Sequence, residues 1–430
     1  MEMRIRITKS SYKMQERNRK MDNRKQKNTV QFPIRINQQG GYFEDQAGNP
    51  FLWQADTCWR IFWMMTFEEA KIYLEDRVCK GFTVIQVHML PHHIYQTNRD
   101  GQNPFLTPGK IDVLNEAYFA HADRVIAYAG KLGLAVAIAP MWLSTWEDDW
   151  HLYYHGEALL TYAKAIATRY GKFANVVAFL HGGDDDAIPL HEEVKRCVPL
   201  YRENAPHVLN TFHAGIGPSY PFFGNEEWYD FCMNYTYDYD SCIHQMLEAR
   251  EKYPHKPAVL GETHYDGNDG ITPDIIRKFA YTSVLLGGCG QTYGNKDIWM
   301  ASMFWQDALW SAAAQHMMTL REIFEEISWW NMKPDAEGNK IRTLRALMPG
   351  ASDHFVPTAC TLDGKELVAY VSDRRYFTVP GMEYAVDAAW IDPVSGRHFS
   401  VIWAENARLQ IPGHNAGGGE DWILHIRLLD

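Results

Sequence analysis

The sequence predicts an α/β protein: a (β/α)8 TIM barrel followed by a small C-terminal antiparallel β-sandwich. Three observations lead to this prediction. Eight short apolar runs, each closed by polar or aromatic residues, recur between residues 51 and 294. Stretches with apolar residues at three- and four-residue spacing separate several of them, as expected for helices with one buried face. Past residue 330 the pattern changes, first to turn residues and then to short segments of alternating polarity.

The eight runs are continuously apolar, which is typical of parallel strands buried on both faces. Strands of this kind that alternate with helices form a parallel sheet, and eight such units in about 275 residues fit a closed barrel. The runs are FLWQAD (51–56), TVIQVHM (83–89), AVAIAPM (135–141), VVAFLHGGD (176–184), VLNTFHA (208–214), FCMNY (231–235), AVLGE (258–262) and GCGQTYG (288–294).

Helical spacing is clearest in four of the intervening segments. Gly81, Gly133 and Gly171 stand where the periodic pattern stops, so we expect them to act as C-terminal caps. The fifth and sixth units show no clear long helix. The four segments are residues 66–81, 115–133, 156–171 and 272–288.

The C-terminal part of the chain predicts a different architecture. Pro, Gly and Asp punctuate short segments of period two, which is typical of an antiparallel β-sandwich. These segments are KELVAYVS (365–372), RYFTVP (375–380), AVDAAWIDP (385–393), HFSVIWA (398–404) and DWILHIRLL (421–429). We therefore expect a barrel over residues 33–335 and a β-sandwich domain over residues 336–430.

Charge is unevenly distributed along the chain. Residues 1–27 hold ten Lys and Arg against three Asp and Glu, a net charge of about +7. The whole chain carries −11, so the remainder carries about −18. We expect residues 1–32 to form a basic, disordered tail. Because nucleic-acid binding requires basic residues on the folded body, the acidic body argues against that function.

Other composition signals limit location and redox state. The chain has no run of 18 apolar residues, so we expect no transmembrane helix and no membrane partner. The basic N-terminal segment is not followed by an apolar run, so we recognise no secretory signal and expect a cytoplasmic protein. The seven scattered cysteines form no CxxC pair, and we expect them to be reduced.

Polar and aromatic residues close the apolar runs, and in this fold the active site lies at the carboxyl ends of the strands. Carboxylates, amides and imidazoles match sugar hydroxyls, and aromatic faces stack on the C–H faces of sugars. The sequence therefore predicts a carbohydrate ligand. The expected substrate-binding residues are Asp56, Trp59, Gln86, His88, Trp142, His213, Asn234, Tyr235, Tyr265, Tyr293 and Trp299.

Two carboxylates stand out among the strand ends. Asp184 follows two glycines at the end of the fourth run, and Glu262 ends the seventh. These strands face each other across a barrel mouth, so the two acids are candidates for the roughly 5–5.5 Å separation of a retaining glycosidase. The neighbouring Asp185 and Asp186 are of the residue type that caps turns and helices. The alternative, which the sequence leaves open, is that their negative charge helps to keep Asp184 protonated.

Two alternatives remain open from the residues alone. His88, His92 and His93 invite a metal-dependent hydrolase, although no HExxH motif is present and we expect no metal. A non-catalytic carbohydrate-binding barrel, in which the acids only hold hydroxyls, is the other. No glycine-rich phosphate loop ending in GK[ST] occurs, so we expect no nucleotide and no other cofactor.

Seven motifs in order resemble one known family, the apiosidase-like domains of glycoside hydrolase family 140. The tail resembles the small β-domain that often follows them and is labelled collagen-binding, a label from which we infer no collagen binding. Its marks are WIDPVSG (390–396) and IPG…DWIL (411–424). The barrel motifs are QADTCW (54–59), RVCKGFTVIQV (77–87), YFAHADRVIAYAGKLGL (118–134), APMW (139–142), RYGKFANVVAFLHGGD (169–184), GETHY (261–265) and QTYGNKDIW (291–299).

The resemblance implies a retaining hydrolase of apiofuranosides or related furanosides from plant cell-wall polysaccharide. It also implies that the Asp of the GGD motif, here Asp184, and the Glu of the GE motif, here Glu262, are the catalytic pair. The chain departs from the pattern in lacking a signal and in reading AFLHGGDDD at the fourth strand. His181 and the additional acids are therefore expected to alter the site.

The predicted mechanism is a two-step displacement. Glu262 attacks the anomeric carbon while Asp184, kept protonated by a raised pKa, gives its proton to the leaving oxygen. Tyr235 or His213 is expected to hydrogen-bond Glu262. Asp56, Gln86 and Asn234 are expected to hold hydroxyls, with Trp142 and Trp299 as the pocket walls.

Overall fold

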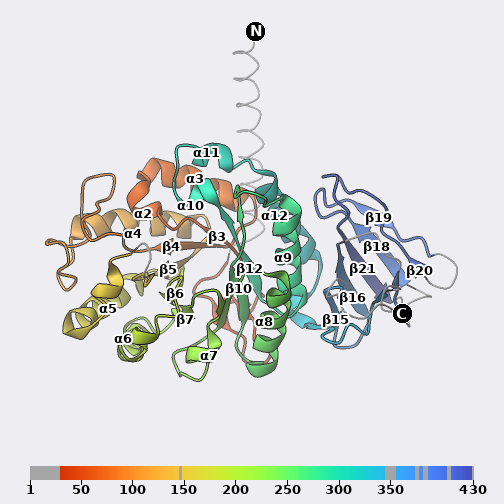
Figure 1. The fold of residues 1–430 in the computed structure, drawn as a ribbon, viewed down its shortest axis with the longest axis horizontal. Helices are drawn as coiled ribbons and strands as arrows, with labels where there is room; N and C mark the ends of the chain where they lie inside the picture. The colour runs from red at the N-terminus through yellow and green to blue at the C-terminus, as the bar shows by residue number, and fades with distance from the viewer. Residues whose placement is uncertain are drawn as a thin grey trace, which may run out of the picture.

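The computed structural model describes residues 30–144, 148–343, 355–372, 377–380, 386–403 and 408–428. Eight parallel strands curl into a barrel, and helices cover its outer surface (Figure 1). Each of the eight predicted runs forms a strand, which confirms the predicted fold class. The barrel strands are β3 (Trp53–Thr57), β4 (Val84–His88), β5 (Ala135–Ala139), β6 (Val176–Gly182), β7 (Leu209–His213), β9 (Cys232–Tyr235), β10 (Ala258–Glu262) and β12 (Gly290–Asn295).

The strands run β7-β6-β5-β4-β3-β12-β10-β9 around the sheet, with β8 (Gly217–Pro218) antiparallel to β9. Between β7 and β9 the ring closes through individual hydrogen bonds. The Asp230 backbone N–H donates to the Asn210 carbonyl at 2.8 Å, and the Thr211 hydroxyl donates to the Phe231 carbonyl at 2.6 Å. Closure matters for function because it brings the ends of β6, β7 and β10 to one mouth.

The helices begin where the sequence supplies caps. Thr66 and Glu69 form a complete capping box at the start of α3, and Asn115 caps α4. The helices are α2 (Ile61–Met64), α3 (Phe67–Cys79), α4 (Glu116–Lys131), α5 (Gly156–Tyr170), α6 (His191–Asn204), α7 (Tyr220–Phe223), α8 (Tyr239–Lys252), α9 (Pro273–Leu285), α10 (Lys296–Trp299), α11 (Trp305–Ala308) and α12 (Ala312–Glu326). Short 3₁₀ turns occur at η1 (Trp150–Leu152), η2 (Ile188–Leu190) and η3 (Trp329–Asn331).

The helices in the structure differ from the predicted ones in two details. The fifth unit contains only the four-residue α7, as its sequence indicated, whereas the sixth carries the 14-residue α8. Helix α8 is polar overall, so its sequence did not predict a long helix, but one face of it is buried and includes Cys242, Met246 and Ala249. Gly81 and Gly133 have the left-handed φ of a C-cap, but Gly171 has φ −62°. At Gly171 a Cβ would lie 2.8 Å from the Ala167 carbonyl, so close packing requires glycine there.

The amino-terminal end of the barrel is closed by a small hairpin. β1 (Arg35–Ile36) and β2 (Phe43–Glu44) pair antiparallel. The Phe43 ring packs against Trp53 at 5.5 Å and Phe231 at 5.4 Å between ring centroids. These buried aromatics fill the barrel beneath the strands, so open space for a ligand lies at the opposite, carboxyl end.

The C-terminal residues form two antiparallel sheets, as predicted. A six-stranded sheet runs β13-β15-β16-β21-β18-β19, and a three-stranded sheet runs β14-β17-β20. The six-stranded sheet begins with β13 at Met332, slightly before the boundary expected at residue 336. The remaining strands are β14 (Arg342–Thr343), β15 (Thr358–Thr361), β16 (Glu366–Val371), β17 (Phe377–Thr378), β18 (Val386–Ile391), β19 (His398–Ser400), β20 (Arg408–Leu409) and β21 (Trp422–Leu428).

Helices α9 and α12 lie between the barrel strands and the six-stranded sheet (Figure 1). Arg277 of α9 crosses this junction and binds Asp421 through two bonds of 2.8 Å. Tyr370 and Asn415 donate further hydrogen bonds to the same carboxylate, and both charged side chains are nearly inaccessible. A buried pair of this kind ties the two parts together, because removing one partner leaves the other charge unpaired.

We therefore expect Arg277→Met to lower the free energy of unfolding by about 3–5 kcal/mol, measured by equilibrium urea denaturation. The matched control is Arg196→Met, whose ion pair with Glu193 lies on the surface. That change should cost about 1 kcal/mol or less. Equal losses for the two variants would contradict the structural role of Arg277.

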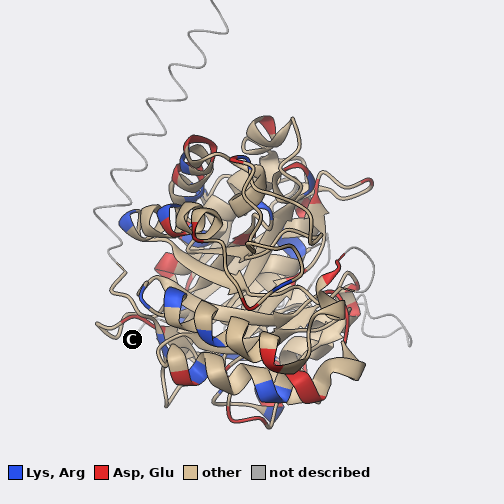
Figure 2. Ribbon diagram, turned by 90° about the vertical axis from the view of Figure 1, so that its left-hand side faces the viewer, with Lys and Arg blue, Asp and Glu red and all other residues tan. Residues whose placement is uncertain are grey.

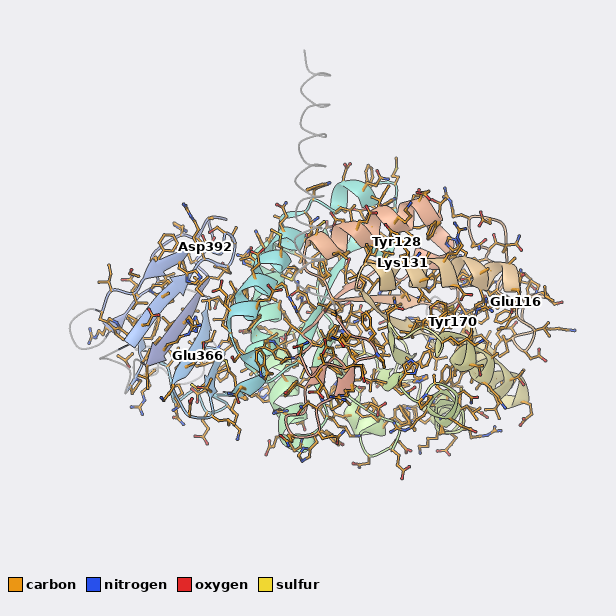
Figure 3. All side chains as sticks on the ribbon, turned by 180° about the vertical axis from the view of Figure 1, so that it is seen from behind. Glu116, Tyr128, Lys131, Tyr170, Glu366 and Asp392 are labelled. Atoms are coloured by element: carbon orange, nitrogen blue, oxygen red, sulfur yellow. The ribbon has the colours of Figure 1, made fainter. Side chains whose placement is uncertain are left out.

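Outside the junction, charges of both signs are interspersed along the helices (Figure 2). Many pair locally: seen from behind in Figure 3, α4 carries Glu116, and Arg169 of α5 binds both Glu116 at 2.7 Å and Asp123 at 2.8 Å. All seven cysteines are buried and free, as expected. Within the described ranges, no helix has the length and apolar character to cross a membrane. The predicted tail lies almost entirely outside the described residues.

Candidate active site

A pocket of about 430 Å³ opens at the carboxyl ends of the barrel strands. This volume is within the range of roughly 300–1,000 Å³ typical of small-ligand sites. Its lining comes from the loops and strand ends around the whole mouth. Eight of the predicted site residues line it, and they are Trp59, His88, Trp142, Asp184, Tyr235, Glu262, Tyr265 and Trp299.

Asp184 reaches the mouth through a strained turn after β6. Gly182 and Gly183 have φ of 86° and 142°, and Asp184 itself has φ 42°. A Cβ on Gly183 would lie 2.4 Å from the Trp142 ring, so only glycine lets the chain pass this wall. Positive φ is costly for aspartate, and such strain is retained mainly where function needs the side chain's direction. The Asp184 side chain is solvent-exposed at the rim.

Glu262 lies deeper, at the end of β10. The pairing of β10 with β9 shifts register between Leu260 and Glu262. A Cβ on Gly261 would lie 2.4 Å from Met233, so the strand can bend close to β9 only with glycine at this position. Irregularities of this kind re-aim side chains next to active sites. Here the bend turns Glu262, only 5% exposed, toward the pocket.

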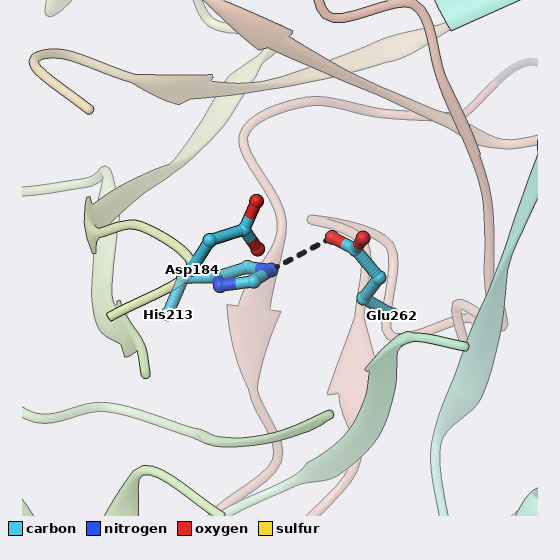
Figure 4. A group of neighbouring side chains, drawn as sticks. All are labelled: Asp184, His213 and Glu262. Atoms are coloured by element: carbon cyan, nitrogen blue, oxygen red, sulfur yellow. Dashed lines mark hydrogen bonds and ion pairs between the residues drawn. The ribbon is translucent and has the colours of Figure 1, made fainter. Parts of the chain in front are cut away.

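The two acids converge with a third side chain, His213 at the end of β7 (Figure 4). The His213 Nε2 lies 3.1 Å from Glu262 Oε2. One carboxylate oxygen each of Asp184 and Glu262 and one ring nitrogen of His213 all lie within 4.8 Å of one another. The predicted opposition of Asp184 and Glu262 across the mouth is therefore present.

The two hydrogen-bond partners of the His213 ring favour its cationic form. Its Nδ1 faces the Ala214 carbonyl at 3.0 Å, and its Nε2 faces the Glu262 carboxylate. Both partners are acceptors, so both nitrogens must donate when Glu262 is ionised. Burial lowers the pKa of His213, but the hydrogen bond and charge of Glu262 and the charge of Asp184 outweigh it and raise the pKa above its usual value. His213 can therefore donate to the Ala214 carbonyl and to Glu262 at the same time.

This pair should make stability depend on pH. Because the pKa of His213 is raised on folding, its contribution is fully present below about pH 6.5 and is lost as pH rises through the folded-state pKa. We expect the stability difference between wild type and His213→Gln to be larger at pH 5.5 than at pH 9, by urea denaturation at both values.

His181 provides a control of opposite sign. It points away from the pocket, bonds Asn210 at 3.0 Å, and burial lowers its pKa to about 4. Because the unfolded chain then binds more protons between about pH 4 and 6.5, the advantage of wild type over His181→Gln should grow as pH rises through that range. The same pH trend for both variants would refute the assignment of His213.

Aromatic rings form the wall beside the acids. His88 stacks on Trp59 at 4.7 Å and on Trp142 at 4.2 Å between ring centroids. The Trp59 indole N–H donates to the Tyr265 hydroxyl at 3.0 Å. On the other side, Tyr235 and Tyr237 share a hydrogen bond of 2.8 Å. Burial and the charges of the acid pair raise the pKa of both phenols, so they stay protonated and available as donors.

Trp299 closes the pocket on the α10 side. The Arg60 guanidinium lies 4.7 Å from the centroid of the Trp299 ring, and Tyr265 packs edge-on at 6.2 Å. Trp299 is only partly buried, which leaves part of its surface for a ligand. The wall role expected of Trp142 and Trp299 therefore agrees with where the structure places them.

Five predicted substrate-binding residues do not line the pocket. One of them, His213, contacts it only through its bond to Glu262, and the other four bond to other parts of the protein. Asp56, Asn234 and Tyr293 point outward to the helix layer, where they contact Arg77 at 2.6 Å, Met246 at 3.2 Å and Asp266 at 2.7 Å. Side chains alternate along a strand, so these three face away from the barrel interior. Gln86 faces inward but lies one layer below His88, bonded to Thr292 at 2.6 Å. The predicted hydroxyl-binding role of these four is corrected to a structural one.

Asp56 illustrates that role. Arg77 and the Tyr73 hydroxyl both bind its Oδ2, and none of the three side chains is accessible. Burial raises the pKa of Asp56 to about 6, against the opposing effects of Arg77 and Tyr73. The carboxylate is therefore ionised at pH 7 and joins α3 to the first barrel strand.

The loop acids and His181 also have clear places. Asp185 accepts a hydrogen bond from the Ala187 N–H at 2.8 Å, and Asp186 accepts one from the Gly215 N–H at 3.1 Å. Both hydrogen bonds stabilise the loop, which is the capping role, one of the two that the sequence left open. The expectation that His181 alters the site is wrong, because it packs outward against Tyr201.

His88, His92 and His93, the residues of the alternative metal-dependent hydrolase, do not form a group with metal-ligand spacing among the described residues. His92 binds Asp148 at 3.0 Å, whereas His93 is half exposed and lies 3.5 Å from Asp149. Among the described residues, the group with metal-ligand spacing is instead Asp184, His213 and Glu262.

Several residues that line the pocket were not predicted from the sequence. Apart from Lys296, at the start of α10, they lie in loops, where no periodic pattern marks the direction of a side chain. His92 had been considered only as a metal ligand. The others are Ser144, Asp148, Ile216, Tyr237, Asn268, Lys296 and Met300.

Comparison with known proteins gives one family and a shared fold. The family model for the apiosidase-like catalytic domain matches residues 37–331. A solved structure described as a glycoside hydrolase superposes with a TM-score of 0.79 at 22% identity, covering 92% of this chain and 96% of that one. A glycoside hydrolase family 5 structure from Bacteroides vulgatus gives 0.80 at 20% identity, covering 92% and 93%. No curated protein matches the sequence.

Proposed function

The chain belongs to the apiosidase-like family of glycoside hydrolases, and from this premise we propose that it cleaves apiofuranosides or related furanosides from plant cell-wall material with retention of configuration. The observation that carries the proposal is the approach of Asp184 and Glu262 to within 4.8 Å across the pocket. Retaining enzymes place their carboxyl groups about 5–5.5 Å apart, whereas inverting enzymes need about 6.5–9.5 Å.

The different surroundings of the acids assign their roles. Glu262 is buried and bonded to cationic His213, which favours a carboxylate that attacks the anomeric carbon. Asp184 lies exposed at the rim, on the side where a leaving group meets solvent. In the first step Glu262 forms a bond to the anomeric carbon, and Asp184 protonates the departing oxygen. In the second, Asp184 takes a proton from water, whose oxygen displaces Glu262.

The remaining lining residues bind and orient the sugar. Trp59 and Trp142 offer flat faces for C–H stacking. One of the two hydroxyls of Tyr235 and Tyr237 donates to the other, so the second is left to donate to a sugar oxygen. Because the lining encircles the mouth, a terminal sugar enters end-on. We therefore favour a small glycoside or oligosaccharide over the interior of a polymer.

The test is a turnover screen with 4-nitrophenyl furanosides, including the β-D-apiofuranoside, followed by ¹H NMR of the first sugar anomer released. Retention of configuration supports the mechanism, and release of the opposite anomer would refute it. The family assignment to a catalytic domain argues against a purely carbohydrate-binding barrel.

A metal-assisted hydrolase is the second candidate, because Asp184, His213 and Glu262 have metal-ligand spacing. Metal binding would require His213 to give up its hydrogen bond to Glu262 and to lose a proton. Activity unchanged by EDTA supports the two-carboxylate mechanism. Activity abolished by EDTA and restored by a divalent cation would favour the metal.

A further inference from the structure

Two buried imidazoles lie in the pocket wall on the side away from Glu262. The Trp142 ring packs on His213 at 4.8 Å and on His88 at 4.2 Å between centroids. Beyond His88, the His92 ring follows edge-on at 5.6 Å. Both histidines line the pocket, although they are only 3% and 8% exposed. They therefore border the space that a sugar bound at Glu262 would extend into.

The hydrogen bond of His92 to Asp148 shows which nitrogen of the ring is left without a partner. Its Nδ1 lies 3.0 Å from Asp148 Oδ1, and the Asp148 side chain is 2% exposed. A carboxylate accepts, so Nδ1 donates to Asp148 and Nε2 is the nitrogen left for another partner. Nε2 is buried and has no hydrogen-bond partner within the described residues.

His88 adds two more unpartnered nitrogens. Neither its Nδ1 nor its Nε2 has a hydrogen-bond partner in the part of the chain that the structure describes. Burial, His92 and His213 lower its pKa well below the usual value, so the ring is neutral with one donor and one acceptor. Buried polar atoms without partners are costly and uncommon, which points to a partner supplied by a ligand.

The chemistry of that ligand follows from its surroundings. The unpartnered Nε2 of His92 and the donor–acceptor ring of His88 match hydroxyl groups, each of which both donates and accepts. Trp63 packs against both imidazoles, at 6.1 Å from His88 and 5.7 Å from His92, and keeps the rings fixed. With Trp142 beside them, the wall suits a neutral ring that carries hydroxyls on one edge.

We propose that His88 and His92 form a sugar-hydroxyl subsite, with Asp148 as the positioning residue that fixes the His92 ring. This inference deepens the proposed function by adding residues that select polyhydroxylated rings over apolar ones. The interaction concerns binding, and so it can be tested without turnover.

A matched pair of variants isolates the Nε2 position. In His92→Asn the shorter amide can still donate to Asp148 but withdraws the group at Nε2, whereas in His92→Gln an amide reaches the Nε2 position. We expect His92→Asn to weaken sugar binding about tenfold and His92→Gln to stay within about threefold of wild type. His93→Asn, half exposed and outside the pocket lining, is the control and should bind as wild type does.

The probes are D-apiose, L-arabinose, D-xylose and D-galactose, titrated against protein with ¹⁵N-labelled histidine. Cyclopentanol is the matched probe that has a furanose-sized ring and a single hydroxyl. We expect at least one sugar, and not cyclopentanol, to move the Nε2 resonance of His92. No movement with any sugar, equal movement with cyclopentanol, or unchanged affinity in His92→Asn would overturn the proposal.

The role of Asp148 has its own spectroscopic readout. In wild type the ¹⁵N spectrum should show His92 protonated at Nδ1. Asp148→Leu should shift the proton toward Nε2, and Asp148→Asn, whose carbonyl still accepts, should restore the wild-type tautomer. An unchanged tautomer in Asp148→Leu would contradict the positioning role. Because binding is measured without hydrolysis, a protein that fails to cleave furanosides can still pass or fail these tests.

Discussion

Glu262→Gln is expected to lower kcat by about 10⁴-fold or more, because a neutral amide cannot form the covalent intermediate. The amide still occupies the same volume and can accept a hydrogen bond from His213. Folding should therefore be retained, and the loss should appear in kcat more than in KM. The measurement is steady-state hydrolysis of the best 4-nitrophenyl furanoside, with a thermal melt to verify folding.

Two further experiments make this prediction specific. Glu248→Gln changes an exposed glutamate paired with Lys252 on α8 and should keep full activity. In Glu262→Ala, sodium azide has room to attack from the position of the lost carboxylate, so the glycosyl azide should have inverted configuration. Wild-type turnover by Glu262→Gln would exclude Glu262 as the nucleophile.

Asp184→Asn should have the second-largest effect, and its size should depend on the leaving group. General acid catalysis contributes about 10²- to 10⁴-fold, and we expect a loss of that order for alkyl or sugar leaving groups. A 2,4-dinitrophenyl leaving group needs little protonation, so the first step with it should be nearly unaffected. The measurement is a plot of log kcat/KM against leaving-group pKa, which should be steep for the variant and shallow for wild type.

The neighbouring aspartates provide matched controls. Asp185→Asn and Asp186→Asn keep the carbonyl oxygens that accept from Ala187 and Gly215, so the loop and the activity should persist. In Asp184→Ala, azide should attack the glycosyl-enzyme and give the retained azide. A flat leaving-group dependence for Asp184→Asn would remove Asp184 from the proton-donor role.

The two catalytic candidates could be predicted because backbone signals mark them. Gly182 and Gly183 before Asp184, and Gly261 before Glu262, indicate where strands end and where the chain bends. The fold places the ends of parallel strands at one mouth, so the acids had to approach each other. His213, one of two residues expected to bond Glu262, does so, while Tyr235 bonds Tyr237 instead.

Three of the corrected substrate-binding assignments, Asp56, Asn234 and Tyr293, have one cause, which is the alternation of side chains along a strand. Asn234 and Tyr235 are adjacent in one strand, so only one of them could face the pocket. The same alternation, counted inward from Trp53 at the base of the barrel, turns Asp56 toward the helices. Tyr293 follows the inward-facing Thr292 in the same strand, so its side chain faces the helices. Gln86 is at an inward-facing position of its strand. How far it lies below the barrel mouth depends on the stagger of the strands, the shear of the barrel.

The sequence by itself determined the eight strand units, the C-terminal sheets and the pair of acids, because periodicity, caps and strand-end glycines are local signals. Only the tertiary structure decided the loop residues that complete the pocket, such as Asp148, and the ion pair between Arg277 and Asp421. The contact of His92 with Asp148 joins residues that are 56 positions apart in the sequence, and that of Arg277 with Asp421 joins residues 144 positions apart. Their formation depends on how strands and loops are brought together in space, which no local pattern encodes.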